Sequence, residues 1–321
     1  LPLATLAARY TFPFKGVFSA LVLVPLILPP FVGAIGLHHL LGKYGAVNTL
    51  LVDMGLFSEG YDFIGNGGFW AIVFIEALHL YPILYLNATA ALANLDPALE
   101  EAAENMGASP WQRFRQIILP LIRPGLFAGA TIVFIWSFTE LGTPLMFDYQ
   151  VVTPVQIFNG IKEMNTSQEP YALTAVMLFA AILFYLLGKI VFGGKAYAMY
   201  SKASVQSVPE KLTSYRGWLA MAAFTIVIGL AVLPHISVLF TSLAVEGSWY
   251  KTVMPGSWTL DHFDGALSHE LAVGSIRNSL LYSTLAVVLD LFIGILIGYI
   301  IVRTKIKGRS ILDALSMLPL A

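Results

Sequence analysis

Glu76 and His79 stand three positions apart in the stretch FIEALHLYP, so a helix would place both side chains on one face. With this spacing, helices of di-iron bundles supply a carboxylate and an imidazole to a metal. Such a bundle needs two pairs of this kind and two further carboxylates. The sequence offers one pair, which argues against a metal site. An acid inside an apolar helix otherwise marks a solute pathway or a polar contact between helices, and both interpretations are open for Glu76.

Two further carboxylates lie in apolar surroundings. Glu140, in FTELGTP, comes near the outer end of an apolar run, and the Gly142 and Pro144 that follow would break a helix. It is expected either to face a solute vestibule or to lie at the membrane surface. Asp290, in VVLDLFIG, lies deep within another apolar run and needs a partner, so pathway and packing roles are both open. The sequence contains no cysteine, which excludes disulfides, thiolate metal sites and cysteine nucleophiles.

The segments that carry these residues are long and apolar. Hydrophobic residues make up 57% of the 321 residues and charged ones only 12%, with a mean hydropathy of +0.76. A soluble domain has about 25% charged residues. This composition predicts an all-α, polytopic membrane protein with about six full transmembrane helices and partial ones at both termini. The expected spans are residues 17–41, 69–92, 126–147, 172–192, 218–243 and 280–302, and the three prolines at 25, 29 and 30 predict a broken first span.

The placement of basic residues predicts the orientation of these spans. Of the 18 lysines and arginines, 14 fall on one side of the alternating pattern. The other side holds four: Lys43, Lys162, Lys251 and Arg277. Since the side rich in basic residues faces the cytoplasm, residues 96–120 are expected to be cytoplasmic.

This polar segment, DPALEEAAENMGASPWQRFRQIILP, has the local signals of two short helices. Asp96 and the proline after it suit the start of the first helix, and Gly107 suits a left-handed cap at its end. Ser109 and Gln112 form a capping box that starts the second helix. Pro120 is expected to end it.

Seven positions of the segment also follow a fixed pattern, E-A-A-x(3)-G-x(9)-I-x-L-P. They are Glu101, Ala102, Ala103, Gly107, Ile117, Leu119 and Pro120. The pattern resembles the EAA loop of permease subunits of binding-protein-dependent ABC importers. The resemblance implies the type I permease fold, with a short helix of the loop docked on an ATP-hydrolysing subunit. Small alanines allow close approach, Glu101 can pair with a basic group, and Ile117 and Leu119 can anchor the loop on the transmembrane helices.

The resemblance also implies partners and a location. We expect two ABC ATPase subunits on the cytoplasmic side, an extracytoplasmic solute-binding protein, membrane lipid around the chain, and no nucleic acid. The protein would reside in a bacterial inner membrane as a non-catalytic transport subunit. The sequence has no G-x-x-x-x-G-K-[ST] stretch, so ATP and Mg²⁺ are expected on the partner ATPase, and the chain itself is expected to bind no cofactor.

A weak internal repeat suggests two fused halves. Residues 8–26 align without gaps with residues 302–320, at an offset of 294. We therefore expect a first permease half at residues 1–194, a linker at 195–216 and the start of a second half at 217–321, with both halves incomplete. A second loop of the EAA type is expected near position 395, beyond these residues.

The preferred function is ATP-driven import of a small polar or charged solute. The overall pattern is most similar to that of fused permeases for ferric iron, with those for 2-aminoethylphosphonate and polyamines as alternatives. A competing hypothesis is a proton-coupled secondary transporter that uses Glu76, Glu140 and Asp290. A third is a membrane enzyme built on Glu76 and His79.

Overall fold

The computed structural model describes residues 1–64, 68–162, 167–192, 209–309, 312 and 316. Nearly all regular structure in this part of the chain is helical, which confirms the predicted all-α class. The elements, in chain order, are α1 Pro2–Arg9, β1 Tyr10–Thr11, α2 Lys15–Leu21, the 3-10 turn Val24–Leu26, α3 Pro30–Leu41, α4 Ala46–Asp53, α5 Phe69–Ala93, α6 Pro97–Asn105, α7 Pro110–Arg113, the π turn Phe114–Ile118, α8 Leu119–Thr139, α9 Gly142–Met146, α10 Thr153–Lys162, α11 Glu169–Phe192, β2 Glu210–Lys211, α12 Ser214–Leu243, α13 Asp261–Ser268 and α14 Glu270–Arg303. The strands β1 and β2 pair in parallel over two residues each.

Five helices are long and apolar enough to cross a membrane, and a bent pair makes a sixth candidate. The five are Phe69–Ala93, Pro110–Thr139, Glu169–Gly188, Tyr215–Leu243 and Glu270–Arg303. The bent pair, Lys15–Leu26 and Pro30–Asp53, turns by 94° at its break. All six predicted spans therefore have a counterpart. The break falls at Pro29 and Pro30, which cannot donate the backbone hydrogen bonds that would continue the helix.

The prediction that Pro120 ends a helix is wrong. Helix α7 runs through the π turn directly into α8, so that Pro110–Thr139 forms one span of 30 residues. Proline normally interrupts a helix because it lacks an N–H and its ring clashes with the carbonyl one turn earlier. The wider π turn immediately before Pro120 changes the local hydrogen-bond register, and the helix continues past the proline.

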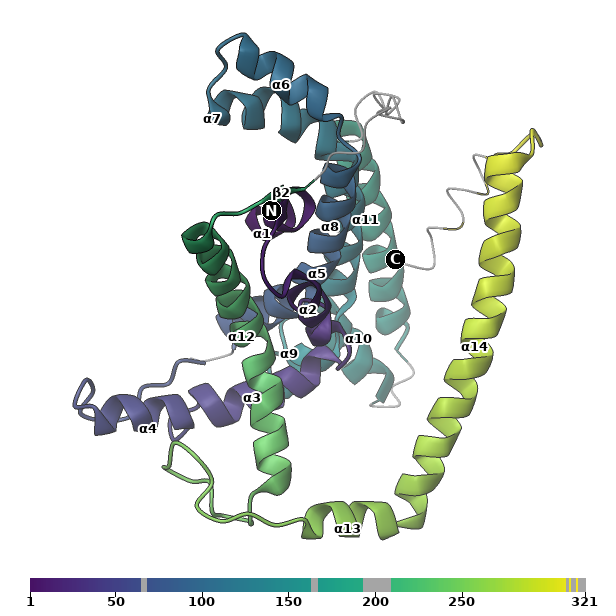
Figure 1. Cartoon of the computed structure of the whole chain (residues 1–321). Coiled ribbons are helices and arrows are strands. Elements are labelled where there is room, and N and C mark those ends of the chain that lie inside the picture. Colours follow the sequence, from purple (N-terminus) through teal and green to yellow (C-terminus); the bar gives the residue numbers. More distant parts are fainter. Residues whose placement is uncertain (65–67, 163–166, 193–208, 310–311, 313–315, 317–321) are drawn as a thin grey trace.

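The helices pack around α5 and α12. Helix α5 lies against α8 and α1, and α12 crosses α3 (Figure 1). Phe224 of α12 is fully buried, with ring centroids 5.4 Å from Phe12 and 5.8 Å from Phe18. The crossing of α3 and α12 depends on Gly36, because a Cβ there would lie 1.9 Å from the carbonyl oxygen of Pro234.

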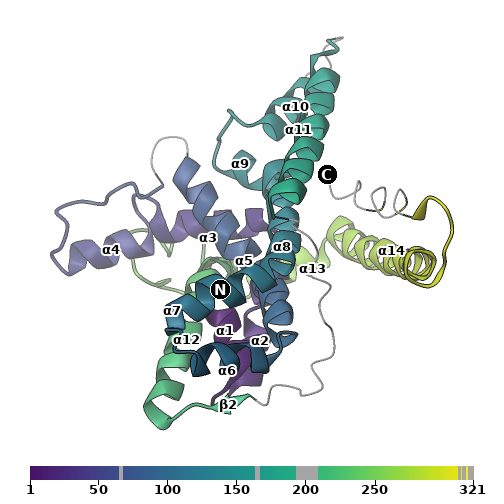
Figure 2. The same ribbon diagram turned by 90° about the horizontal axis from the view of Figure 1, so that it is seen from above.

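Different short helices lie at the two ends of the bundle. Helices α6 and α7 project from one end, and α4 and α13 lie at the other (Figure 1). Helix α14 stands away from the bundle in both views and joins it through α13 (Figures 1 and 2). None of the residues of α14 is buried.

The chain leaves α1 and α14 through turns of the same backbone geometry. The first residue after α1, Tyr10, is extended at φ −124° and ψ 152°, and its counterpart after α14, Thr304, has φ −109° and ψ 161°. Four residues later, Phe14 has φ 58° and Gly308 has φ 96°. Each pair is separated by the 294 positions of the sequence repeat.

Side chains close the two turns in the same way. The Lys15 ammonium donates to the carbonyl oxygen of Tyr10 at 2.8 Å. The Arg309 guanidinium donates to the carbonyl oxygen of Thr304 at 3.2 Å. A basic side chain at the same place in the repeat thus reaches back to the same carbonyl in both copies.

Candidate functional site

The first helix of the loop at residues 96–120 has well-formed ends. The side chain of Asp96 accepts a hydrogen bond from the N–H of Ala98 at 3.0 Å, as expected of an N-cap. At the other end Gly107 has φ +83°, so the predicted left-handed cap is confirmed. The Gly107 N–H donates to Glu104 O at 2.8 Å and the Ala108 N–H to Ala103 O at 3.0 Å. These two bonds define a Schellman motif, which gives α6 a rigid, sharply defined end.

Helix α7 begins with the predicted capping box. The Gln112 side chain accepts from the Ser109 N–H at 2.8 Å, and the Gln112 N–H donates to the Ser109 hydroxyl at 3.3 Å. An ion pair of 2.5 Å between Arg113 and Glu104 joins α7 to α6. The two short helices therefore form one unit.

A second ion pair attaches this unit to the bundle. Both guanidinium nitrogens Nη1 and Nη2 of Arg9, the last residue of α1, donate to the two carboxylate oxygens of Glu100. The side chains are only 24% and 18% exposed, respectively. The EAA pattern implies that Glu101 can pair with a basic group when the loop docks on a partner. Within the described residues, neither ion pair involves Glu101, whose side chain is exposed and free to meet a partner.

The outer face of α6 is apolar although it faces solvent. Leu99 is 49% exposed and Met106 is 82% exposed. With the exposed Ala102 between them they follow the i, i+3, i+7 spacing of one helix face. Ala103 lies on the inner side and is only 3% exposed, so the two alanines of the pattern have different surroundings. Trp111 of α7 adds a third large exposed apolar side chain.

The connection of the loop to the transmembrane helices depends on a residue that sequence reasoning missed. The predicted anchors Ile117 and Leu119 are half-buried. Ile118 between them is buried and packs in the same core cluster as Leu92 and Ile122. It was missed because the predicted anchors came from the seven positions of the pattern, and residue 118 is an undefined position between two of them.

A cavity of about 380 Å³ lies beside the break in the bent span. It is lined by the break itself (Leu26 to Pro30), by Glu76, His79 and Leu80 of α5, and by Trp136, Thr139 and Glu140 at the end of α8. Three of the four intramembrane residues proposed from the sequence, Glu76, His79 and Glu140, therefore line this one cavity. Asp290 is exposed on α14 and does not line this cavity.

Thr143 of α9 links the two carboxylates of the cavity. Its hydroxyl donates to Oε1 of Glu76 at 3.0 Å, and its N–H donates to Oε1 of Glu140 at 3.0 Å. Thr143 is fully buried and Glu76 is 6% exposed. Sequence reasoning treated this region only as a helix break, so the role of Thr143 was not anticipated.

His79 also lines this cavity, and one of its ring nitrogens has no hydrogen-bond partner. The residue is 6% exposed, and its Nδ1 is buried without a hydrogen-bond partner. The described residues contain no group of three or more histidine or acidic side chains that could hold a metal ion.

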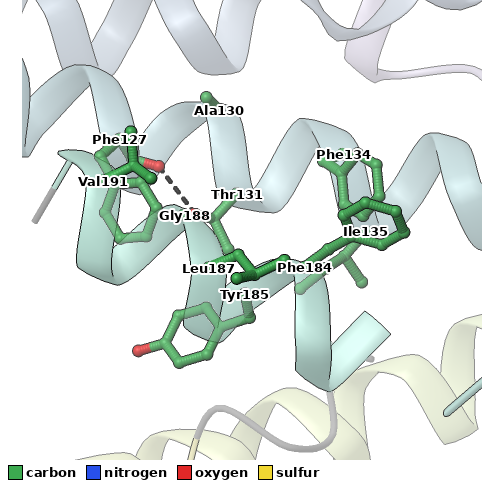
Figure 3. A pocket seen from close by; sticks show the side chains of 10 residues that line it. All are labelled: Phe127, Ala130, Thr131, Phe134, Ile135, Phe184, Tyr185, Leu187, Gly188 and Val191. Carbon is green, nitrogen blue, oxygen red and sulfur yellow. Dashed lines mark hydrogen bonds between the residues drawn. The ribbon is translucent and has the colours of Figure 1, made fainter. Parts of the chain in front are cut away.

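A second hollow has different chemistry. It measures about 320 Å³ and lies between α8 and α11, lined mainly by aromatic and aliphatic side chains (Figure 3). The one hydroxyl drawn on its α8 side, that of Thr131, donates to the carbonyl oxygen of Phe127 at 2.8 Å. This hollow is a packing surface for apolar groups and offers nothing to a polar solute.

Comparison with known families gives one match over most of the chain. Residues 1–197 match the family described as "Binding-protein-dependent transport system inner membrane component". The matched region contains the loop at residues 96–120 and the cavity beside Glu76.

Individual relatives transport metals according to their names. The chain is 30% identical over 326 aligned positions to "Putative ferric transport system permease protein FbpB 1" of Haemophilus influenzae, covering 98% of this chain and 49% of that protein. It is 28% identical to ferric transport system permease protein FbpB of Actinobacillus pleuropneumoniae, covering 92% and 43%. It is 33% identical to molybdenum transport system permease protein ModB of Escherichia coli, covering 45% and 60%. The chain thus spans about half the length of the two ferric relatives.

Proposed function

Because the chain belongs to the family of binding-protein-dependent transport system inner membrane components, the permeases of ABC importers, we propose that it forms the membrane path of an ATP-driven importer for ferric iron. Two relatives named as ferric permeases, which align with 92% or more of the chain, support this cargo. The permease itself hydrolyses nothing. A separate ATPase supplies the energy.

The exposed apolar face of α6 is the observation that carries this proposal. A surface-exposed helix loses free energy by presenting Leu99 and Met106 to water, since each buried CH₂ is worth about 0.8 kcal/mol. Such a face is explained by a partner protein that covers it. The exposed carboxylate of Glu101 beside this face gives the partner a charged contact. The partner is the ATPase, whose movement would be passed to the bundle through Ile118 and the Arg9–Glu100 ion pair.

The distribution of charge supports a cytoplasmic position for α6 and α7. They lie at the end of the bundle that also carries Arg9 and β2 (Figure 1). The opposite end carries α4 and α13, where basic residues are few. By the positive-inside rule, the first end faces the cytoplasm of a bacterial inner membrane, and the second end faces the solute-binding protein.

We also propose that the chain contains parts of two homologous halves. The matching turns after α1 and α14 support this, because they share backbone geometry and a basic side chain over an offset of 294. The first half is residues 1–194 and the second begins at 217. The linker predicted at 195–216 lies mostly outside the described residues. A complete transporter would pair the two halves with two ATPase subunits.

Other functions remain as competing proposals. Permeases for 2-aminoethylphosphonate or polyamines have the same architecture and would differ in cargo alone. A proton-coupled transporter using Glu76, Glu140 and Asp290 would need no ATPase. A membrane enzyme would need Glu76 and His79 for turnover of a substrate.

The decisive experiment introduces a negative charge into the outer face of α6. In Met106→Glu, a carboxylate enters the face proposed to dock on the ATPase, and we expect at least tenfold less ATPase to co-purify with the permease. Binding-protein-stimulated ATP hydrolysis should fall in parallel. Met54→Glu is the matched control, because Met54 is also exposed, at 64%, and lies after α4 at the other end of the bundle. Equal ATPase recovery with both variants would contradict the proposal.

A further inference from the structure

The cavity beside the broken span also indicates which kind of cargo the protein carries. We infer that it is a transient binding site for a hard, positively charged cargo ion, held by Glu76 and Glu140 with His79 beside them. The inference rests on the proposed import function and deepens it. It assigns the chemical class of the cargo from the chain itself, independently of the names of relatives.

The charge of the lining gives the sign of the ion. Glu76 and Glu140 are the acidic residues of the lining, and no lysine or arginine contributes to it. Within a membrane, where the dielectric constant is low, two carboxylates strongly repel an anion and attract a cation. A molybdate-like oxyanion therefore does not fit this cavity, although relatives named as molybdenum permeases align with part of the chain.

The broken backbone can supply a neutral oxygen ligand. In a continuous helix, the residue at position 30 would donate its N–H to the carbonyl oxygen of Leu26. Pro30 has no N–H, so it cannot make that bond, and Leu26 lines the cavity. Carboxylate and carbonyl oxygens are the ligands that hard cations prefer. Unwound segments of membrane helices coordinate cations in this way in other transporters.

His79 provides an observation independent of the acids. Its ring lines the cavity and is 6% exposed, yet Nδ1 has no hydrogen-bond partner. A buried polar atom without a partner costs about 1–3 kcal/mol. An unsatisfied nitrogen in the wall of the cavity would gain a partner if an ion with its water shell occupied the adjoining space.

The cavity is suited to binding an ion weakly during transport and not to holding it permanently. The described residues hold no cluster of three metal-ligating side chains, so an ion here would keep part of its hydration shell. A volume of about 380 Å³ has room for it, since one water takes up about 30 Å³. Weak and incomplete coordination is what a transport path requires, because the ion must leave again.

The first test measures ion binding without transport. Trp136 lines the cavity and can sensitise the luminescence of bound Tb³⁺, a hard trivalent ion. With the full-length permease in detergent, we expect sensitised emission that falls at least tenfold in the double variant Glu76→Gln/Glu140→Gln. Trp136→Phe should also abolish it, which identifies the donor. Glu169→Gln is the control, because Glu169 is an exposed carboxylate at the start of α11, outside the cavity.

The second test measures uptake of radioactive Fe³⁺ by proteoliposomes that contain the permease, its ATPase and its binding protein. The double variant should lose at least tenfold in uptake per ATP hydrolysed. Unchanged emission and unchanged uptake would overturn the cation site and leave the importer intact. Absence of stimulated ATP hydrolysis in wild type would overturn the proposed function, while the Tb³⁺ measurement would still decide the site. Uptake of molybdate by wild type would overturn the cation assignment.

Glutamine preserves size and can still accept from Thr143, so the double variant is expected to fold. Its monodispersity in size-exclusion chromatography checks this directly. If Glu76 and Glu140 serve only to brace α5 against α9 through Thr143, the variant would lose thermal stability and Tb³⁺ emission would be as weak in wild type as in the variant. That result would also overturn the inference.

Discussion

The Arg9 guanidinium and the Glu100 carboxylate form a two-pronged ion pair although they are 91 positions apart. The pair joins the last residue of α1 to the inner side of α6. Helix α1 packs on α5 and is followed at once by the turn that begins the bent span. A displacement of α6 would therefore act directly on the segment that leads to the break beside Glu76.

Breaking this ion pair should weaken the coupling between ATP hydrolysis and transport. We expect Arg9→Ala and Glu100→Ala each to reduce cargo uptake per ATP hydrolysed several-fold. The charge-swapped double variant Arg9→Glu/Glu100→Arg should recover part of the loss. Residues in direct contact show interaction energies of about 0.5–3 kcal/mol in double-mutant cycles. Additive effects in the cycle would show that the ion pair carries no coupling.

At position 107 we expect the protein to accept only residues that readily adopt a left-handed backbone conformation. A Cβ at Gly107 meets nothing within 4 Å, so its φ of +83° is the sole obstacle. Gly107→Val should distort the end of α6 and reduce stimulated ATP hydrolysis at least fivefold, because left-handed geometry costs a non-glycine residue about 1–2 kcal/mol. Gly107→Asn should stay close to wild type, since asparagine adopts this conformation more readily. Equal losses in both variants would point to a steric effect of docking instead.

Gly36 should be needed for the crossing of α3 and α12. A methyl group there would overlap the carbonyl oxygen of Pro234, a backbone atom that cannot move aside cheaply. Overpacking of this kind costs about 1–3 kcal/mol, so Gly36→Ala should lower the Tm of the purified permease by several degrees. Gly229→Ala, in α12 with nothing within 4 Å, should leave the Tm unchanged. A similar Tm for both variants would contradict the observed packing.

Thr143 should stabilise the arrangement of α5, α8 and α9. Thr143→Val keeps the shape and removes the hydroxyl that donates to Glu76, which leaves a buried carboxylate short of a donor. The expected cost is about 1–3 kcal/mol, measurable by thermal unfolding in detergent. In Thr131→Val, the lost hydroxyl bonds only to a carbonyl oxygen of its own helix, and the change should be small. If the two substitutions cost the same, Thr143 has no special bracing role.

The orientation can be tested by cysteine labelling, since these 321 residues contain no cysteine. Met106→Cys should react with a membrane-impermeant maleimide only from the cytoplasmic side. Met54→Cys should react from the outside. Both methionines are exposed, so access is limited by the membrane alone. Labelling of both positions from the same side would overturn the proposed topology.

Local features of the protein followed from the sequence because their causes are local. Asp96, Gly107 and Ser109 act on atoms within a few residues of themselves, and each capping interaction was found where predicted. The six apolar spans and the break at the prolines were likewise predicted, because hydropathy and the missing N–H of proline do not depend on distant residues. The loop pattern indicated the family for the same reason.

Tertiary structure alone decided which distant groups meet. Nothing local distinguishes Glu100 from Glu101, and only the approach of α1 selects Glu100 as the partner of Arg9. Nothing local links Thr143 to Glu76, which lies 67 positions away. Nothing local selects Ile118 for burial, and only the packed helices place it in the same cluster as Leu92 of α5. The sequence thus determined the helices and the loop, and the packing of those helices brought the two carboxylates and His79 to one cavity, because contacts across a bundle depend on helix positions that no short stretch encodes.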